Sequence, residues 1–298
     1  MNVAELPLTL LVNPSSAGGR ALKMLPRVEH ALDASRAVFR VQRTRGLEHG
    51  VEQALLAVEA NEVPVVLSGD GLIGAVGGAM AGSETPLGIV PCGRGNDLAR
   101  VLGVPEDPEG AVAVLLGGRS RRIDVGEANG RRFLGIVSVG FDSEANKLAN
   151  QTHFLRGNLV YAYAALRTLA RWKPARFSIQ VGERRARVSG YSVSVANSSC
   201  FGGGMYIAPD AELDDGEFDV VTVGEVGKLR FVGNLPKVFK GTHVEEDEVS
   251  VFRARRLELD ASRPFPVYAD GEHLTELPVS LRVIPQALSV LVPAQGAA

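Results

Sequence analysis

The sequence predicts a two-domain protein, in which an α/β domain built on a parallel sheet is followed by a β-rich domain of antiparallel strands. Three observations lead to this expectation. The chain has 298 residues, more than one hydrophobic core usually organises. Over the first third, short apolar runs alternate with stretches of helical periodicity. From about residue 123 the pattern changes to period-two alternation.

The first domain is expected to alternate strands with helices. Apolar runs of strand length include "LPLTLLV" and "PVVLS", and the stretches between such runs place apolar residues at helical spacing. This order predicts a parallel sheet covered on both faces, whose ligands lie at the carboxyl ends of the strands. The expected strands are 6–12, 38–42, 64–68 and 86–90, and the expected helices are 21–32, 47–60 and 72–81.

The second domain is expected to be antiparallel sheet, because apolar and polar residues alternate along its strands. Its expected strands are 131–140, 176–181, 186–197, 217–223 and 253–261, and two helices, 155–172 and 228–240, interrupt them. No linker or internal repeat marks the boundary, which we place near Arg122. The domains then cover 1–122 and 123–285.

Composition narrows the classes of function. Hydrophobic residues make up 45% of the chain and charged residues 22%, which are values of a globular protein with a large core. A net charge of −2 argues against a dedicated nucleic-acid binder. Cys92 and Cys200 stand far apart and outside any metal-ligand spacing, which favours a reducing cytoplasm. No apolar run approaches the roughly 18 residues of a membrane span, so a protein that works on membranes would visit their surface.

Three glycine-containing turns each follow an expected strand of the first domain: "NPSSAGG" (13–19), "SGDG" (68–71) and "PCGRGND" (91–97). Glycines let main-chain N–H groups approach an anion, and a helix that starts after each turn adds the positive end of its dipole. The alternative is three tight turns with ordinary caps, and spacing alone does not separate the two interpretations. Asp70, between two glycines at the end of a buried strand, must shape a turn or contact a ligand.

An ordered set of motifs runs from about Leu10 to Pro293. Its members, in order, are "LLVNPSSAGG", "GDG" followed by a helix, "PLGIVPCGRGNDLARVLGVP", "RRIDVG", "GFDSEAN", "DDGEFDV" and "YADGE". In this order they resemble the diacylglycerol kinase catalytic domain family, which includes bacterial lipid kinases and sphingosine kinase-like enzymes. The segments "FKGTHVEEDEVSVFRARRL" and "VYADGE" look especially like actinobacterial members that phosphorylate diacylglycerol.

The resemblance implies a Rossmann-like nucleotide domain and a β-rich, sandwich- or barrel-like lipid domain, with ATP and Mg²⁺ in the cleft. The last segment, 286–298, would return to the first domain through "ALSVLVP". The family's nucleotide contacts map to the glycine turns and their neighbours. These residues are Asn13, Pro14, Ser15, Ser16, Thr44, Ser68, Gly69, Asp70, Gly71, Arg94, Gly95, Asn96 and Asp124.

The chain departs from the family pattern at several of these positions. The family usually has a glycine where Ser68 stands, a threonine where Leu72 stands and another threonine where Arg94 stands, and Gly74 and Ala75 replace an Asn-Glu pair. Each missing threonine removes a hydroxyl that could hold a phosphate. The main-chain N–H groups remain, and the Arg94 guanidinium could pair with a phosphate instead.

Glu272 in "YADGEHL" matches the family's catalytic base, and Asp70 is the second catalytic candidate, as a polar anchor near ATP acting through Mg²⁺ or water. The alternative for Glu272 is a solvated position after an Asp-Gly hairpin turn, which the residues alone would favour. His273 is less favoured, because neighbours on a strand face opposite sides.

The acidic segment "DAELDDGEFDV" (210–220) corresponds to the family's structural Mg²⁺ site. By resemblance, Asp215 supplies a carboxylate, while Glu212 and Glu217 supply main-chain carbonyls, a set of hard oxygen ligands that suits Mg²⁺. The alternative is an ordinary Asp-Gly turn, which would explain Gly216 equally well. Asp124 in "RRIDVG" resembles the residue that reaches the nucleotide-bound Mg²⁺ through water, and Asp97 could serve there or at a helix N-terminus.

The resemblance therefore predicts an ATP-dependent lipid kinase that phosphorylates the primary hydroxyl of diacylglycerol to give phosphatidic acid. The alternatives are a sphingoid-base or other lipid kinase, an NAD kinase-like enzyme with the same "GDG" turn, and a degenerate nucleotide-binding regulator marked by Leu72 and Arg94. The expected partners are ATP and a lipid at a membrane surface, without nucleic acid. The expected location is the cytoplasm, peripheral to the inner face of the membrane. Family members often form homodimers, but no sequence feature identifies an interface.

Overall fold

The computed structural model describes residues 6–152 and 158–294. The chain divides into two compact units, one of residues 1–125 with 284–298 and the other of residues 126–283. It passes between the units in two long strands, β5 (Arg119–Ala128) and β15 (Val279–Val292). No helix within the two described stretches is long and apolar enough to cross a membrane.

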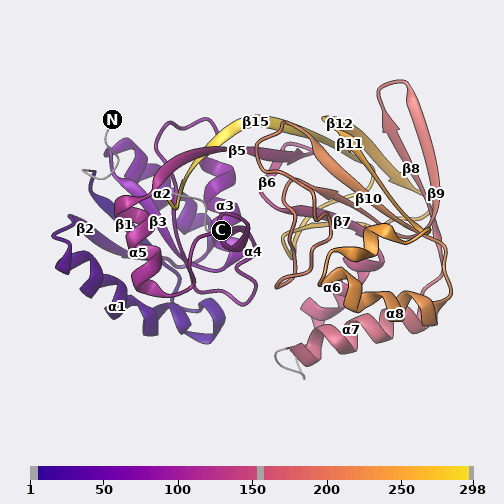
Figure 1. The fold of residues 1–298 in the computed structure, drawn as a ribbon, viewed down its shortest axis with the longest axis horizontal. Helices are drawn as coiled ribbons and strands as arrows, with labels where there is room; N and C mark the ends of the chain where they lie inside the picture. Colours follow the sequence, from indigo (N-terminus) through magenta and orange to yellow (C-terminus); the bar gives the residue numbers. More distant parts are fainter. Residues whose placement is uncertain (1–5, 153–157, 295–298) are drawn as a thin grey trace. The chain divides into compact units, whose positions relative to one another are not determined.

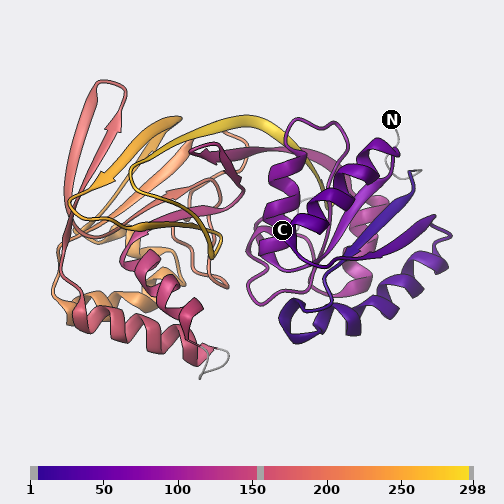
Figure 2. The same ribbon diagram turned by 180° about the vertical axis from the view of Figure 1, so that it is seen from behind.

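The first unit is a parallel four-stranded sheet of order β2-β1-β3-β4 with helices on both faces (Figures 1 and 2). Every residue of β1, β3 and β4 is buried, whereas β2, at the edge, is half-exposed. Helix α1 packs against α5, and α2 packs against α3. The strands are β1 (Leu8–Val12), β2 (Phe39–Arg43), β3 (Val63–Ser68) and β4 (Gly88–Pro91). The helices are α1 (Arg20–Ala34), α2 (Leu47–Glu59), α3 (Asp70–Met80), α4 (Asp97–Val101) and α5 (Pro108–Gly117), with the 3-10 turn η2 (Ser16–Gly18) before α1.

The end of β15 joins the edge of this sheet. The main-chain N–H of Leu87 donates to the carbonyl of Ser289 at 2.8 Å, and that of Leu291 donates to the carbonyl of Leu87 at 3.0 Å. The contact places the returning chain beside β4.

The second unit carries an 11-stranded sheet in which each neighbouring pair with an assigned register is antiparallel. Its main path runs β14-β13-β7-β9-β8-β12-β15-β5-β6, and β10 pairs with β9 and β11. The predicted fold class, α/β followed by antiparallel β, is confirmed. The remaining strands are β6 (Arg131–Phe133), β7 (Ile136–Gly140), β8 (Ala175–Val181), β9 (Arg184–Ala196), β10 (Phe218–Gly224), β11 (Val249–Ala254), β12 (Arg256–Ala261), β13 (Pro266–Ala269) and β14 (Glu272–Glu276).

Aromatic side chains fill the space between this sheet and its helices. Phe141 lies edge-on to Trp172 and to Tyr191, and Phe231 stacks on Tyr191 with ring centroids 4.1 Å apart. Aromatic pairs of this geometry add about 0.5–1.5 kcal/mol beyond the burial of their area. The cluster fixes three helices: α6 (Phe141–Gln151), α7 (Asn158–Arg171) and α8 (Lys228–Val238). The 3-10 turn η3 (Thr242–Glu245) follows α8.

Helix α6 corrects the predicted element list, which had only two helices in this domain. Two expected strands are also each divided: 131–140 contains β6 and β7, and 253–261 contains the end of β11 and all of β12. The main-chain N–H groups of Gly135 and Ile136 donate to the carboxylate of Asp270, in the turn between β13 and β14, which interrupts the first of these runs. The predicted helix 155–172 corresponds to α7, and its first three residues lie outside the described residues.

Candidate active site

The turns that follow β3 and β4 touch at the carboxyl edge of the parallel sheet. A Cβ placed on Gly69 would lie 2.9 Å from the Cα of Gly93, and a Cβ on Gly93 would lie 2.6 Å from the Cα of Gly69. The main-chain N–H of Cys92 donates to the carbonyl of Ser68 at 2.9 Å. Both glycines are therefore required by backbone-to-backbone contact, since a side chain at either would force the turns apart.

The carboxylate of Asp70 joins these two turns. It accepts the main-chain N–H of Asn96 at 2.8 Å and that of Asp97 at 2.9 Å. Burial and the nearby charge of Asp97 raise the pKa of Asp70, while the main-chain bonds act in the opposite direction. A Cβ on Gly95 would lie 2.8 Å from Asp70 Oδ2, so a side chain at this position would displace the Asp70 carboxylate. Asp70 thus shapes the loop after β4, whatever else it contacts.

The loop after β4 is further fixed from within. Asn96 adopts a left-handed conformation, with φ of 53°, and its buried side-chain oxygen accepts the main-chain N–H of Gly93 at 2.7 Å. Asp97 pairs with Arg100 at 2.8 Å. Arg94 is exposed at the crest of the loop. The side chain of Asn96 therefore supports the loop, and Arg94 is free to turn toward a ligand.

The turn after β1 completes this edge. The side-chain oxygen of Asn13 accepts both the main-chain N–H and the hydroxyl of Ser15, at 3.1 and 2.8 Å. Cys92 Sγ lies 3.8 Å from the buried Ser16 hydroxyl, which links this turn to the loop after β4. Thr44, buried after β2, donates its main-chain N–H to Val12 at 2.8 Å.

The structure therefore brings most of the predicted nucleotide residues to one sheet edge. Helix α3, of 11 residues, begins at this edge, and the N–H groups of its first turn and the positive end of its dipole favour an anion there. Asp124 joins two other elements: its fully buried carboxylate accepts the main-chain N–H of Gln286 at 2.6 Å, which ties β5 to β15. The residues at the edge are Asn13, Pro14, Ser15, Ser16, Thr44, Ser68, Gly69, Asp70, Gly71, Arg94, Gly95 and Asn96.

In the second unit, Glu272 is the first residue of β14, after a turn built by Asp270 and Gly271. Both turn residues have positive φ, 51° and 84°. The Asp270 carboxylate accepts the main-chain N–H groups of Gly135 and Ile136, at 3.1 and 2.9 Å. These two hydrogen bonds fix the backbone of the turn, and the side chain of Glu272, which follows it, is exposed.

Helix α6 borders this turn. The side-chain amide of Asn150 lies 3.5 Å from the carbonyl of Gly271. Burial raises the pKa of Tyr268, a hydrogen bond from Asn150 opposes that change, and the charges of Glu276, Glu144 and Glu272 add to it. Tyr268 therefore lies among three carboxylates. His273 is taken up by other contacts, since its Nε2 lies 3.0 Å from Glu276 and its ring is edge-on to Tyr268.

The acidic turn after residue 210 contains a carboxylate pair around one arginine. Asp215 Oδ1 accepts the main-chain N–H of Glu217 at 3.0 Å, and its Oδ2 lies 3.3 Å from Arg253. Asp219 Oδ1 lies 3.4 Å from the same guanidinium. Asp215 Oδ2 and Asp219 Oδ2 are both buried without a hydrogen-bond donor in the described part of the chain. Unsatisfied buried carboxylate oxygens suit a cation, although Arg253 already supplies one positive charge.

The other two predicted metal residues do not bring their carboxylates to this pair. Glu212 is exposed, and Glu217 lies 3.3 Å from Arg255. Among the described residues no group of three or more His, Cys, Asp and Glu side chains is arranged to hold a metal. Any contribution of Glu212 and Glu217 would therefore come from the main chain, as the resemblance implies.

Sequence reasoning missed three carboxylates. Asp219 and Asp270 stand inside quoted motifs, but each is recognised only through a partner distant in sequence, Arg253 or Gly135. Asp142, in the first turn of α6, is half-buried, and burial raises its pKa to about 6 against a hydrogen bond from Ser192. An acid two residues after the glycine that ends a strand was the available signal for Asp142.

Two family models match the chain. The diacylglycerol kinase catalytic domain matches residues 7–128, and the YegS C-terminal NAD kinase beta sandwich-like domain matches residues 135–292. Among solved structures, a putative diacylglycerol kinase from Bacillus anthracis has a TM-score of 0.81 and 22% identity, covering 97% of this chain and 95% of its own. At that identity the likeness shows the fold.

Curated relatives extend the match over the whole chain. A diacylglycerol kinase of Mycobacterium tuberculosis is 33% identical over 97% of this chain and 96% of its own length. A probable lipid kinase YegS-like protein of Pseudomonas aeruginosa is 32% identical over 82% of this chain and 80% of its own. The resemblance predicted from the ordered motifs is confirmed, and the chain belongs to the diacylglycerol kinase family.

Proposed function

We propose that this chain transfers the γ-phosphoryl group of ATP to the primary hydroxyl of diacylglycerol, giving phosphatidic acid and ADP. The observation that carries the proposal is the joined pair of glycine turns, in which the Asp70 carboxylate gathers two main-chain N–H groups of the loop after β4. Such a backbone frame beside the N-terminus of α3 suits a polyphosphate. The names of the relatives support a lipid acceptor.

In this proposal the first unit binds ATP. The N-terminus of α3 faces the phosphates, and the turns after β1 and β4, which are fixed by their own hydrogen bonds, lie at the same edge together with Thr44. Arg94, exposed on its loop, pairs with a phosphate in place of the hydroxyl that the family usually offers. Asp124, whose buried carboxylate is fixed by Gln286, would reach the nucleotide's metal through water, as the resemblance implies. Mg²⁺ bound with ATP would neutralise phosphate charge as the γ-phosphoryl group is transferred.

The second unit supplies the acceptor side and the base. The lipid hydroxyl oxygen attacks the γ-phosphorus, the bond from that phosphorus to the β,γ-bridging oxygen breaks, and ADP leaves. The hydroxyl proton passes to the carboxylate of Glu272, which the Asp270 turn holds at an exposed position. A second Mg²⁺ would be held by Asp215 and by main-chain carbonyls of Glu212 and Glu217, where it stabilises the acidic turn.

An apolar face of α8 supports work at a lipid surface. Leu229, Val232, Leu235 and Phe239 recur at helical spacing and are exposed, Leu229 to 90%. Phe231 of the same helix stacks on Tyr191 and so attaches α8 to the core. We propose that the exposed face enters the membrane interface. Leu229→Asp should then reduce co-sedimentation with phospholipid vesicles, while Val38→Asp, at an exposed apolar position of the first unit, should not. Equal co-sedimentation of both variants and the wild type would contradict this role.

One set of parallel assays tests which molecule accepts the phosphoryl group. Purified protein, labelled ATP and Mg²⁺ are incubated with diacylglycerol or sphingosine in identical mixed micelles, or with NAD. We expect kcat/KM to be highest for diacylglycerol. A preference for sphingosine would leave a lipid kinase but overturn this acceptor, and label on NAD would overturn the lipid class. Binding of ATP without transfer to any acceptor would indicate a nucleotide-binding regulator.

A further inference from the structure

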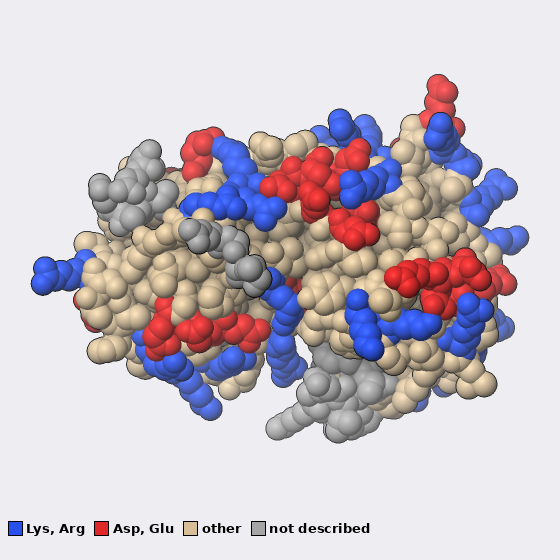
Figure 3. Space-filling view, viewed as in Figure 1, with Lys and Arg blue, Asp and Glu red and all other residues tan. Residues whose placement is uncertain are grey.

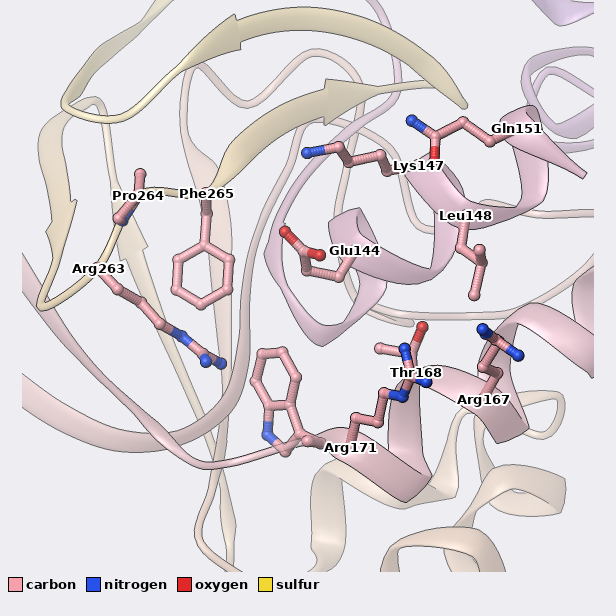
Figure 4. Close-up of a pocket in the computed structure, with 11 residues that line it drawn as sticks. Glu144, Lys147, Leu148, Gln151, Arg167, Thr168, Arg171, Arg263, Pro264 and Phe265 are labelled. Carbon is pink, nitrogen blue, oxygen red and sulfur yellow. The ribbon is translucent and has the colours of Figure 1, made fainter.

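The second unit contains a cavity of about 420 Å³ between helices α6 and α7 and the segment that precedes β13 (Figure 4). The size is that of a small-molecule site. Its lining includes four cationic side chains, Lys147, Arg167, Arg171 and Arg263, and a single acidic one, Glu144. The lining therefore has an excess of three positive charges, in a chain whose net charge is −2. On the face that Figure 3 displays, groups of Lys and Arg lie beside groups of Asp and Glu.

None of these four cations has an acidic partner in the part of the chain that the structure describes. Within the described residues, no carboxylate lies at ion-pair distance from Lys147, Arg167, Arg171 or Arg263. The Arg167 guanidinium instead lies 5.8 Å from the ring centroid of Tyr163. Like charges gathered around one cavity repel one another, and an anion inside it would relieve that repulsion.

The fourth cation is held in place by the cavity wall. The Arg263 guanidinium lies 4.8 Å from the ring centroids of both Trp172 and Phe265, and it donates to the carbonyl of Lys173 at 2.9 Å. An arginine fixed in this way loses little conformational freedom when it binds a ligand. Because its guanidinium already covers these rings, the arrangement disfavours a stacked nucleotide base.

The wall also offers apolar surface. Leu148, Trp172 and Phe265 line the cavity beside the cations. Trp172 is only 6% exposed, and its indole N–H is buried within the wall, so the ring contributes packing surface and not a hydrogen-bond donor to a ligand.

From the charge and the fixed arginine, we propose that this cavity binds a phosphate group carried by an amphiphile, with the phosphate among the cations and the apolar portion against Leu148 and Phe265. Arginine recognises phosphate oxygens through paired N–H donors, which suits Arg167 and Arg171. Neither Glu272 nor any predicted nucleotide residue lines the cavity. The site is therefore proposed in addition to the kinase site, and its test needs no ATP.

The chain provides its own probe, because Trp172 is its single tryptophan. Intrinsic fluorescence of the full chain is titrated with dihexanoyl phosphatidic acid below its micelle concentration, with dihexanoylglycerol and with inorganic phosphate, and calorimetry repeats each titration. We expect saturable binding of the phosphatidic acid, about tenfold weaker binding of phosphate alone and none of dihexanoylglycerol. Equal affinity for inorganic phosphate would overturn the amphiphile, and tight binding of dihexanoylglycerol would overturn the phosphate.

Paired variants place the binding in the cavity. Arg167→Ala with Arg171→Ala removes two exposed cations of the lining and should weaken phosphatidic acid binding about tenfold or more. Arg184→Ala with Arg187→Ala removes the same charge from an exposed hairpin of the same unit and should leave the affinity unchanged. Equal affinity of the two double variants, or no binding by the wild type in either fluorescence or calorimetry, would overturn the proposal.

Discussion

The carboxylate of Asp70 lies 2.8 Å from the main-chain nitrogen of Asn96 and accepts its N–H, so the first side chain of α3 fixes the loop after β4. Because the carboxylate also accepts the N–H of Asp97, both of its oxygens serve as acceptors for one loop. Asp70 is therefore structural within the free protein, and the proposed contact with the nucleotide's metal would use its remaining lone pairs.

Replacing Asp70 by asparagine should separate these roles. The amide keeps one acceptor but turns an NH₂ group toward a main-chain donor, and one buried N–H left without an acceptor costs about 1–3 kcal/mol. We expect a lower melting temperature and a higher KM for ATP, measured by calorimetry and by steady-state kinetics. If Asp70→Asn melts like the wild type, the loop does not depend on this carboxylate.

Glu272→Gln tests the proposed base. The amide preserves the shape of the side chain but cannot accept the proton, so kcat should fall by roughly 10²–10⁴-fold with little change in KM for ATP. Because Glu272 is exposed, the melting temperature should not change. Glu276→Gln, an exposed carboxylate of the same strand, is the control and should retain most of the activity. A kcat near that of the wild type in Glu272→Gln would remove this residue from the mechanism.

Removal of metal tests the acidic turn. If Asp215 Oδ2 holds Mg²⁺, EDTA should lower the melting temperature of the wild type, because an ion that binds the folded state stabilises it. Asp215→Ala should melt lower than the wild type and no longer respond to EDTA. Glu212→Ala should respond like the wild type, since only its main chain is proposed as a ligand. A wild type that is insensitive to EDTA would show that Arg253 alone balances the turn.

Arg94 is the clearest departure from the family pattern within the glycine turns. A guanidinium can donate two hydrogen bonds to a phosphate, so Arg94→Ala should raise KM for ATP, and Arg94→Thr should restore much of the loss. The side chain is exposed, so thermal unfolding should be unaffected, and the kinetic change cannot be attributed to misfolding. An unchanged KM in Arg94→Ala would leave phosphate binding to the main chain.

The sequence was sufficient for the α/β and antiparallel pattern, because burial imposes it residue by residue. Every residue of β3 is buried, which requires the apolar run "VPVVLS", and β8 alternates buried and exposed residues as its sequence does. Helix α6 was missed because only three of its eleven residues are buried and one of these, Ser143, is polar, so the segment has few apolar residues. Its position depends on packing against α7, a contact that sequence periodicity does not reveal.

The candidate site was predicted only in part, because the sequence shows local features and not the distant contacts that fix them. Glycine turns after strands are local features, and the resemblance located them. The partners that fix them are not local: Asp70 needs the loop at Asn96, and Asp270 needs the chain at Gly135. The cationic cavity was not predicted at all, because Lys147, Arg171 and Arg263 come together only through the fold.

Asp142 gives a prediction for the dependence of stability on pH. Burial raises the pKa of its carboxyl from 3.8 to about 6, so between these values the folded chain binds the proton more tightly than the unfolded chain does. The contribution of this group to the free energy of unfolding therefore falls as pH rises from about 4 to about 6. Above about pH 6 the contribution no longer changes with pH. Asp142→Asn keeps an acceptor for the Ser192 hydroxyl and cannot ionise, so it should lose none of this stability.

The difference in melting temperature between Asp142→Asn and the wild type should accordingly grow in favour of the variant from pH 4 to pH 6 and stay constant to pH 8. Thermal unfolding at fixed ionic strength measures it. Ser192→Ala supplies a second test, because the Ser192 hydrogen bond lowers the pKa of Asp142. Without that bond the pKa should rise further, and the wild-type loss of stability should extend to a higher pH. A difference between Asp142→Asn and the wild type that does not vary with pH would mean that the Asp142 carboxyl titrates alike in the folded and unfolded chain.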